Sequence, residues 1–362
     1  MEQTGGDRPV RSYPLNHPLD EETKYHRREQ YPGRIECPDM KVRLTHIDGK
    51  LPNLALMKLA HWHRAQGDEV ILARTPSPSM FEPCYDKVYG SAIFAWSAPV
   101  VHRLLDAYPD AIVGGTWTSS DQITVEALLE LEQYEHYDYS IYPEYPWSLG
   151  FTQRGCRLNC GFCVVPKKEG RPRSTNTIWD IWRHDTPRNV CLLDNDFFGQ
   201  PRAEWEARMS EIKDGGFRFC LNQGINIRLI DAESATALAS LPYYDDQFKQ
   251  RRLYTAWDNI GQEDIFFKGL GLMNDAGIPS KHLMVYMLIG YKPGETMDEI
   301  MYRFQRLKDA GCLPYPMVYN NLDRNLKRFQ RWVIRRYHEF ITWEDFGKAV
   351  KGQKSMPLPL GI

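Results

Sequence analysis

Three cysteines are the residues whose type and spacing say most about the chemistry of this chain. Cys156, Cys160 and Cys163 lie in the run Gly-Cys-Arg-Leu-Asn-Cys-Gly-Phe-Cys, a C-x3-C-x2-C spacing that follows an expected strand. Cysteine thiolates are the usual protein ligands of iron-sulfur clusters, so the spacing predicts a [4Fe-4S] cluster with one iron that lacks a protein ligand. Such an open iron position can bind and activate another molecule.

A structural zinc site and a ferredoxin-like electron carrier are the alternatives for the same cysteines. Zinc takes four ligands, usually as two close pairs of Cys or His. The nearest further candidates are His184 and Cys191, more than twenty residues downstream of Cys163. The spacing therefore favours the open cluster, and a non-catalytic iron-sulfur electron-transfer protein remains the rival interpretation.

The cysteine spacing, with Phe162 directly before the last cysteine, resembles the signature of the radical S-adenosylmethionine (SAM) superfamily. The resemblance implies that the open iron binds SAM and that the reduced cluster cleaves it to a 5'-deoxyadenosyl radical, which abstracts hydrogen from a substrate. It also implies an electron donor such as flavodoxin or ferredoxin. A small-molecule or peptide substrate and a methyltransferase-like reaction at an unreactive carbon are the expectations.

Composition indicates an ordinary intracellular enzyme. The chain has 362 residues, 42% of them hydrophobic and 25% charged, and a formal net charge of -2, so no global charge favours nucleic acid. The eight cysteines are scattered apart from the triplet, which predicts reduced thiols and a cytoplasmic protein. No stretch resembles a signal peptide or a membrane span, so no membrane partner is expected.

Residues 40–147 predict a parallel, doubly wound α/β domain after an extended arm over residues 1–39. Strands and helices alternate in this segment, and alternation of this kind predicts a parallel sheet with helices on both faces. The expected strands are 41–47, 69–73, 89–96 and 111–114, and the expected helices are 54–66 and 99–108.

This first domain resembles the Rossmann-like, cobalamin-binding-like domain that precedes many radical SAM barrels. The resemblance is carried by Gly114-Gly-Thr116 at a strand end and by the run Leu51-Pro-Asn-Leu-Ala-Leu56. Many such domains carry an Asp-x-His-x-x-Gly loop whose His ligates cobalt, whereas this chain has His46-Ile-Asp-Gly49. A purely structural domain is therefore favoured, and bound cobalamin is the alternative.

Residues 148–322 predict a partial (β/α)6 TIM-type barrel, followed by a C-terminal helix and tail over 323–362. Six strand candidates alternate with amphipathic helices, which indicates parallel strands with crossover helices. Ligands of such folds bind at the carboxyl ends of the strands. The expected strands are 149–153, 190–194, 217–222, 252–257, 283–289 and 316–320.

Polar residues at these strand ends are the candidates for binding SAM. The segments Leu193-Asp-Asn-Asp-Phe-Phe198 and Gly290-Tyr-Lys-Pro-Gly-Glu-Thr296 resemble strand-end motifs of the same branch, and an arginine suits the SAM carboxylate. Asx turns and an ion pair with Asp231 are the structural alternatives. The candidate residues are Phe162, Asp194, Asp196, Asn222, Gln223, Arg228, Asp258 and Gly290.

A basic stripe in the C-terminal segment raises the alternative of an RNA substrate. Its arginines, spaced three and four apart, suit phosphates or a solvated helix face, and the solvated face is favoured. An RNA methylthiotransferase would resemble enzymes with a second three-cysteine cluster in the first domain, where only Cys37 and Cys84 occur. The stripe consists of Arg324, Arg328, Arg331 and Arg335.

Overall fold

The computed structural model describes residues 40–118, 123–131 and 134–352. Throughout these segments the chain is a mixture of helices and parallel sheets, so the α/β class predicted from the sequence is confirmed. The expected arm over 1–39 and the last residues of the tail lie outside the described segments. Among the helices that are described, none combines the length and the apolar character needed to cross a bilayer.

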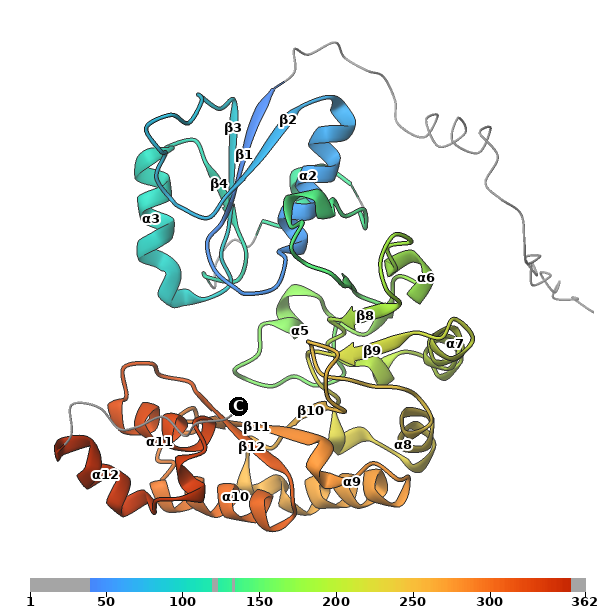
Figure 1. Cartoon of the computed structure of the whole chain (residues 1–362), viewed down its shortest axis with the longest axis vertical. Helices are drawn as coiled ribbons and strands as arrows, with labels where there is room; N and C mark the ends of the chain where they lie inside the picture. Colours follow the sequence, from blue (N-terminus) through green and yellow to red (C-terminus); the bar gives the residue numbers. More distant parts are fainter. Residues whose placement is uncertain (1–39, 119–122, 132–133, 353–362) are drawn as a thin grey trace, which may run out of the picture.

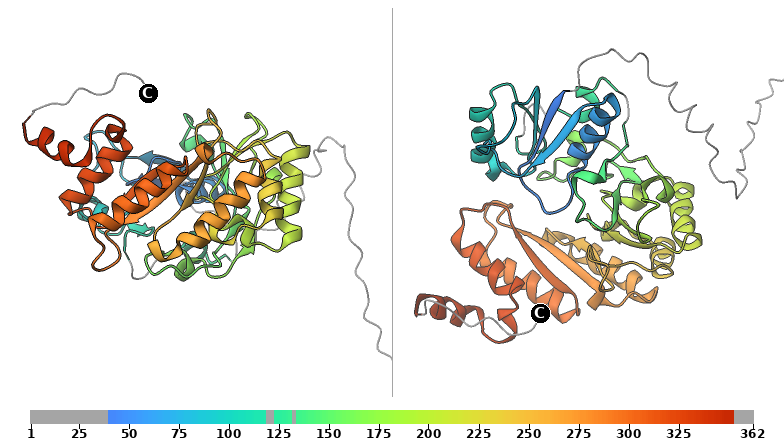
Figure 2. Two further views of the ribbon diagram at one scale, coloured as in Figure 1. Left: turned by 90° about the horizontal axis from the view of Figure 1, so that it is seen from below. Right: turned by 45° about the horizontal axis from the view of Figure 1, so that its top comes forward.

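The first sheet is four-stranded and parallel, in the order β2-β1-β3-β4. Val42 and Leu44 in β1 are fully buried because this central strand has neighbours on both sides and helices on both faces. Figure 1 shows the sheet between α2 and α3, and the turned view in Figure 2 agrees. The strands are β1 (Lys41–His46), β2 (Glu69–Ala73), β3 (Lys87–Ser91) and β4 (Ile112–Gly114).

The helices of this unit begin and end where local chemistry predicts. α2 (Leu54–Gln66) begins after Asn53, whose side chain accepts a hydrogen bond from the Leu56 amide, and it ends at Gly67 with φ of 96°. Its bounds match the predicted helix. α3 (Ala98–Ala107) lies one residue earlier than predicted, and a single turn, α4 (Val125–Leu128), follows the sheet.

Two three-stranded parallel sheets follow, in the orders β5-β8-β9 and β10-β11-β12. They are neighbours, because the Ile225 amide just after β9 donates to the Tyr254 carbonyl of β10, at 2.7 Å. Successive strands in the chain are thus successive in space. The strands are β5 (Ser148–Gly150), β8 (Asn189–Leu192), β9 (Arg218–Leu221), β10 (Leu253–Ala256), β11 (Leu283–Ile289) and β12 (Leu313–Val318).

Helices line the outer side of this row of strands (Figure 1). Apolar residues of strands and helices meet there in one core that includes Phe219, Val285 and Phe304. On the inner side, Cys191 and Cys220 are paired in register and fully buried, as small apolar residues would be. The helices are α6 (Ile178–Ile181), α7 (Arg202–Asp214), α8 (Ala232–Ala239), α9 (Glu263–Asp275) and α10 (Met297–Asp309).

The predicted first strand of this region, 149–153, is divided in the structure. β5 ends at Gly150, and β6 (Gln153–Arg154) pairs antiparallel with β7 (Arg173–Ser174) instead. The resulting hairpin encloses the cysteine loop and the single-turn helix α5 (Val165–Lys168). The last strand, β12, begins three residues earlier than predicted.

The C-terminal helix α11 (Arg324–Ile334) packs on β12 through Leu326, Phe329 and Val333, which are buried. The expectation that its arginines form a solvated face is wrong for Arg328. This guanidinium is half-buried and lies 4.3 Å from the ring centre of Trp343 in α12 (Trp343–Gly352). The arginines at 324, 331 and 335 are exposed.

Short 3-10 helices complete the described elements. Three of them lie between the end of a strand (β8, β9 or β10) and the outer helix that follows it. They are Ala95–Ser97, Tyr139–Ile141, Phe197–Gly199, Ile227–Leu229, Ile260–Gln262, Ser280–His282 and Tyr337–Glu339.

Candidate functional site

The three cysteines of the motif lie on one loop between β6 and α5. All are free thiols of intermediate exposure, and the Cys163 amide donates to the Cys160 carbonyl in a tight turn, at 2.9 Å. Burial raises the pKa of the Cys156 and Cys163 thiols, and the neighbouring thiols add to the shift. Within the described residues, no three His, Cys, Asp or Glu side chains have the arrangement of a metal site. The donor set is nevertheless of the type that iron-sulfur clusters use.

Asp196 fixes the cysteine loop from the end of β8. Its carboxylate accepts hydrogen bonds from the Arg157 Nε at 2.7 Å and from Nη2 at 3.0 Å, and also from the Arg157 backbone amide at 3.2 Å. A bidentate arginine pair of this kind fixes direction as well as distance. Since Arg157 directly follows Cys156, Asp196 positions the loop.

Asp194 fixes the start of the same segment. Its carboxyl group is fully buried and accepts from the Thr152 amide at 2.7 Å, from the Gln153 amide at 3.2 Å and from the Thr152 hydroxyl. Burial raises the pKa of Asp194 to about 7, although these three donors favour the carboxylate. Asp194 therefore also has a positioning role, joining the chain after β5 to the end of β8.

A cavity of about 270 Å³ lies beside Cys160. Three predicted site residues line it: Phe162, Arg228 and Asp258. The Arg228 Nη2 lies 3.9 Å from the Cys160 Sγ, and its Nη1 donates to the Gln262 amide oxygen at 3.0 Å. The cavity thus brings a cation and a carboxyl group from two other segments beside the Phe162 ring of the cysteine loop.

The walls of this cavity are held by backbone contacts. Asp258 accepts from the Leu288 amide at 2.8 Å, and burial raises the pKa of its carboxyl group. Tyr291 packs edge-on against Phe162, with ring centres 5.2 Å apart. The Gly290 amide donates to the Glu295 carboxylate at 2.7 Å, so Gly290 has a structural hydrogen bond at the position where a SAM contact was expected.

The two other predicted residues lie elsewhere on the rim. Asn222 is half-buried after β9, and its amide donates to the Leu192 carbonyl at 2.9 Å. Gln223 is exposed and lines a second, larger cavity of about 560 Å³. That cavity lies between the first sheet and the rim formed by β5, β8 and β9.

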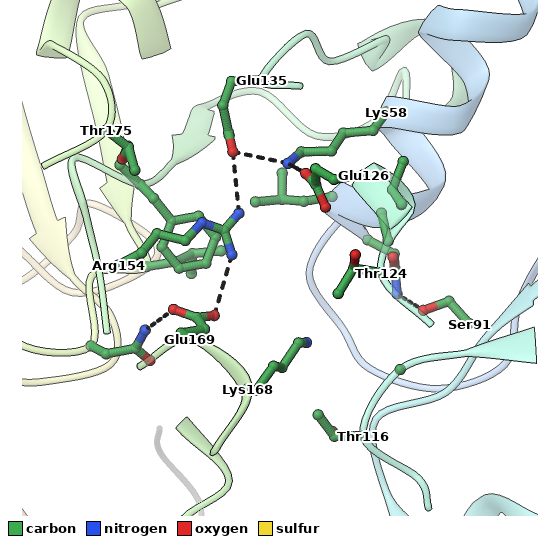
Figure 3. A pocket seen from close by; sticks show the side chains of 18 of the residues that line it. Lys58, Ser91, Thr116, Thr124, Glu126, Glu135, Arg154, Lys168, Glu169 and Thr175 are labelled. Atoms are coloured by element: carbon green, nitrogen blue, oxygen red, sulfur yellow. Dashed lines mark hydrogen bonds and ion pairs between the residues drawn. The ribbon is translucent and has the colours of Figure 1, made fainter. Parts of the chain in front are cut away.

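Charged side chains dominate the larger cavity (Figure 3). Lys58 from α2 lies 2.6 Å from Glu126 and 2.9 Å from Glu135. Arg154 from β6 lies 3.6 Å from Glu135 and 3.2 Å from Glu169. This network joins the first unit to the segment that carries the cysteines.

Sequence reasoning missed Arg157, Glu169 and the ion pairs of the larger cavity. Arg157 offered one signal, since a guanidinium beside a cysteine of the motif can pair with a carboxylate at a strand end. The partners of Glu135 offered none, because they come from distant parts of the chain. A scan against protein-family models matches no family, and a search of the curated proteins finds no relative.

Proposed function

We propose that this protein is a radical SAM enzyme. The observation that carries the proposal is the cysteine loop, whose three thiols lie on a segment fixed by Asp194 and Asp196 and beside a cavity that contains Arg228 and Asp258. A catalytic cluster needs thiolate ligands, a place for its substrate and a rigid mounting. This chain has residues suited to each of these roles.

We infer that the two three-stranded sheets form one partial (β/α)6 barrel of the TIM type, and that the first sheet is a Rossmann-like domain. The parallel order and the outer helices support the barrel, and the order β2-β1-β3-β4 supports the doubly wound domain. The domain bounds 40–147 and 148–322 belong to the same proposal.

Cys156, Cys160 and Cys163 would hold the [4Fe-4S] cluster. When bound, the reduced cluster supplies the electron that cleaves SAM to a 5'-deoxyadenosyl radical. Arg228 is placed to donate to the SAM carboxylate, since a guanidinium fork matches a carboxylate. Its contact with the Cys160 sulfur would also tune a bound cluster, because hydrogen bonds to the sulfurs of such clusters shift their potentials.

We infer that the first domain does not hold cobalamin. The cavity that faces it measures about 560 Å³, within the range of roughly 300–1,000 Å³ that suits drug-sized ligands, and a corrinoid with its nucleotide arm is larger. His46, which ends β1, lies 3.0 Å from the Tyr142 hydroxyl through its Nδ1 and does not line this cavity. A cytoplasmic location and a flavodoxin-type or ferredoxin-type electron donor complete the proposal.

Anaerobic reconstitution tests the proposal. We expect the wild-type protein to bind one [4Fe-4S] cluster, and Cys156→Ala, Cys160→Ala and Cys163→Ala each to lose it, as measured by iron analysis and electron paramagnetic resonance. Cys84→Ala, an exposed thiol of the first unit, is the matched control and keeps the cluster. Adding SAM to the reduced protein is expected to change its spectrum and to yield 5'-deoxyadenosine.

Other outcomes would decide against the proposal. A full cluster in the triple cysteine variant would place it elsewhere in the chain. A loaded, reduced protein that neither binds SAM nor changes its spectrum with SAM would favour the electron-transfer protein. A stoichiometric corrinoid spectrum after cobalamin-replete expression would overturn the inference about the first domain.

A further inference from the structure

The larger cavity has an excess of positive charge. Seven charged side chains line it, of which four are cations and three are carboxylates. Its walls also carry hydroxyl and amide groups, among them Ser91, Thr116 and Asn195. A cavity with charged and polar groups on several sides suits a polar ligand better than an apolar one.

The three carboxylates of the cavity are already engaged. Glu126 binds Lys58, while Glu135 lies between Lys58 and Arg154. Glu169 binds Arg154 and also accepts from Asn195 at 2.8 Å and from the Gly155 amide at 3.1 Å. Lys58 and Arg154 are therefore neutralised by the protein itself.

Lys168 and Arg173 are the two cations that remain without a carboxylate among the described residues. The Lys168 side chain has no hydrogen bond or ion pair among the described residues, although the Glu126 and Glu169 charges act on it, and its ammonium points into the cavity in Figure 3. The Arg173 Nη1 donates to a backbone carbonyl, that of Glu169, at 2.7 Å. Desolvation lowers the pKa of Lys168, so an anion bound beside this amine would favour its charged form.

The cavity adjoins the cysteine loop through Glu169. This residue follows Lys168, and its carboxylate holds the Gly155 amide directly before Cys156. The Glu169 charge also acts on the Cys163 thiol. A molecule bound at Lys168 would thus lie next to the cysteine loop and between the two units, and residues of both units could contact it.

We propose that this cavity is the substrate site and that it takes a small molecule with a phosphate or carboxylate group, which Lys168 and Arg173 neutralise. That the bound molecule is a substrate rests on the proposed function. The anion site itself rests on the geometry of the cavity alone. The volume of about 560 Å³ suits a molecule of metabolite size. The hydroxyl and amide groups opposite Lys168 would then bind the polar remainder of the molecule.

Protection of Lys168 from acetylation tests the anion site. The full-length, reconstituted protein is labelled with an acetylating reagent at constant ionic strength, with inorganic phosphate, acetate or chloride present, and labelling of each lysine is measured by mass spectrometry. We expect phosphate to protect Lys168 saturably and to leave labelled its neighbour Lys167, which is also exposed but does not line the cavity. Protection by acetate as well would show that a carboxylate suffices, whereas protection by phosphate alone would indicate a phosphorylated substrate.

Arg173→Gln and Arg171→Gln are the matched variants, because both residues are exposed but only Arg173 lines the cavity. Arg173→Gln is expected to raise the phosphate concentration for half-protection about tenfold, as loss of one charge-assisted contact predicts, and Arg171→Gln to leave it unchanged. The same assay on Cys156→Ala tests the anion site independently of the cluster. We expect phosphate to protect Lys168 in this variant as well. If neither phosphate nor acetate protects Lys168, or if Lys167 is protected equally, the anion site is wrong. RNA is added in a parallel sample, and protection of Lys168 by RNA alone would contradict the small-molecule site and indicate nucleic acid.

Discussion

Asp194 and Asp196 lie two residues apart and are both buried, but their carboxyl groups have different hydrogen-bond partners. Asp196 is neutralised by the Arg157 guanidinium, whereas Asp194 has only neutral donors, namely two backbone amides and the Thr152 hydroxyl. A buried carboxyl group without a cation prefers the protonated form. This explains why the pKa is raised, to about 7, at Asp194.

The raised pKa of Asp194 predicts a pH dependence of stability. The unfolded carboxyl group ionises near 3.8 and the folded one near 7, so the native state holds the extra proton between these values. Stability from this group is therefore complete below about pH 4 and is lost as pH rises toward 7, with a slope of up to about 1.4 kcal/mol per pH unit. Asp194→Asn should remove this slope.

Urea unfolding between pH 4 and pH 8 measures the slope in both proteins. Asp185→Asn is the control, because that side chain is 76% exposed and its ion pair with Arg183 should contribute little. The slopes are compared rather than the absolute free energies, since Asn alters the hydrogen bonds to Thr152. Identical slopes in wild-type protein and Asp194→Asn would contradict the assigned pKa.

At the scale of elements, the β6–β7 hairpin determines whether the cysteine loop closes. Gly155 has φ of +80°, and a Cβ at this position would overlap the carbonyl of Arg171, two residues before β7. The amide of the next residue, Cys156, donates to the Gly170 carbonyl at 3.2 Å. The two ends of the loop thus approach so closely that only glycine fits between them.

Gly155→Ala should therefore disturb the loop more than a similar substitution at Gly170. Gly170 also has a positive φ, of +73°, but a Cβ there would meet no atom within 4 Å. We expect Gly170→Ala to lower the free energy of unfolding by about 1 kcal/mol, from the backbone conformation alone. Gly155→Ala should cost more and should also reduce iron bound per chain after reconstitution. Equal effects of the two variants would show that the close approach is unimportant.

At the scale of the whole molecule, Glu135 forms ion pairs with both units beside the larger cavity. Its carboxylate lies between Lys58 of the first unit and Arg154 of the cysteine segment, and all three side chains are at most 16% exposed. Removing one member of a buried ion pair leaves an uncompensated charge. The partners here keep Glu126 and Glu169, respectively, so the loss should be partial.

Glu135→Gln should lower the free energy of unfolding by roughly 1–3 kcal/mol, less than the loss of an isolated buried pair. Glu69→Gln is the matched control, because Glu69 pairs with Lys41 at 3.9 Å on an exposed surface and should contribute at most about 1 kcal/mol. Urea unfolding compares the two. A cost at Glu135 no larger than at Glu69 would mean that the network does not join the two units energetically.

The sequence by itself determined the cysteine spacing and several of the elements of this protein, though not the divided strand at 149–153. Helix 54–66 and strand 69–73 have their predicted bounds, because apolar spacing, an Asn cap and a terminal glycine all act within a few residues of the chain. The three cysteines share one loop for the same reason, since they lie within eight residues of the chain. That this loop holds a cluster stays a prediction.

Only the tertiary structure decided which side chains meet. Asp196 binds Arg157, 39 residues away, and Glu135 contacts Lys58, 77 residues away. Such pairs depend on where strands and loops converge after folding, and neither periodicity nor local propensity records that. Lys168 also shows this. Nothing in its neighbouring sequence predicts a binding role, and only the folded structure places its ammonium in the cavity without an ion pair among the described residues.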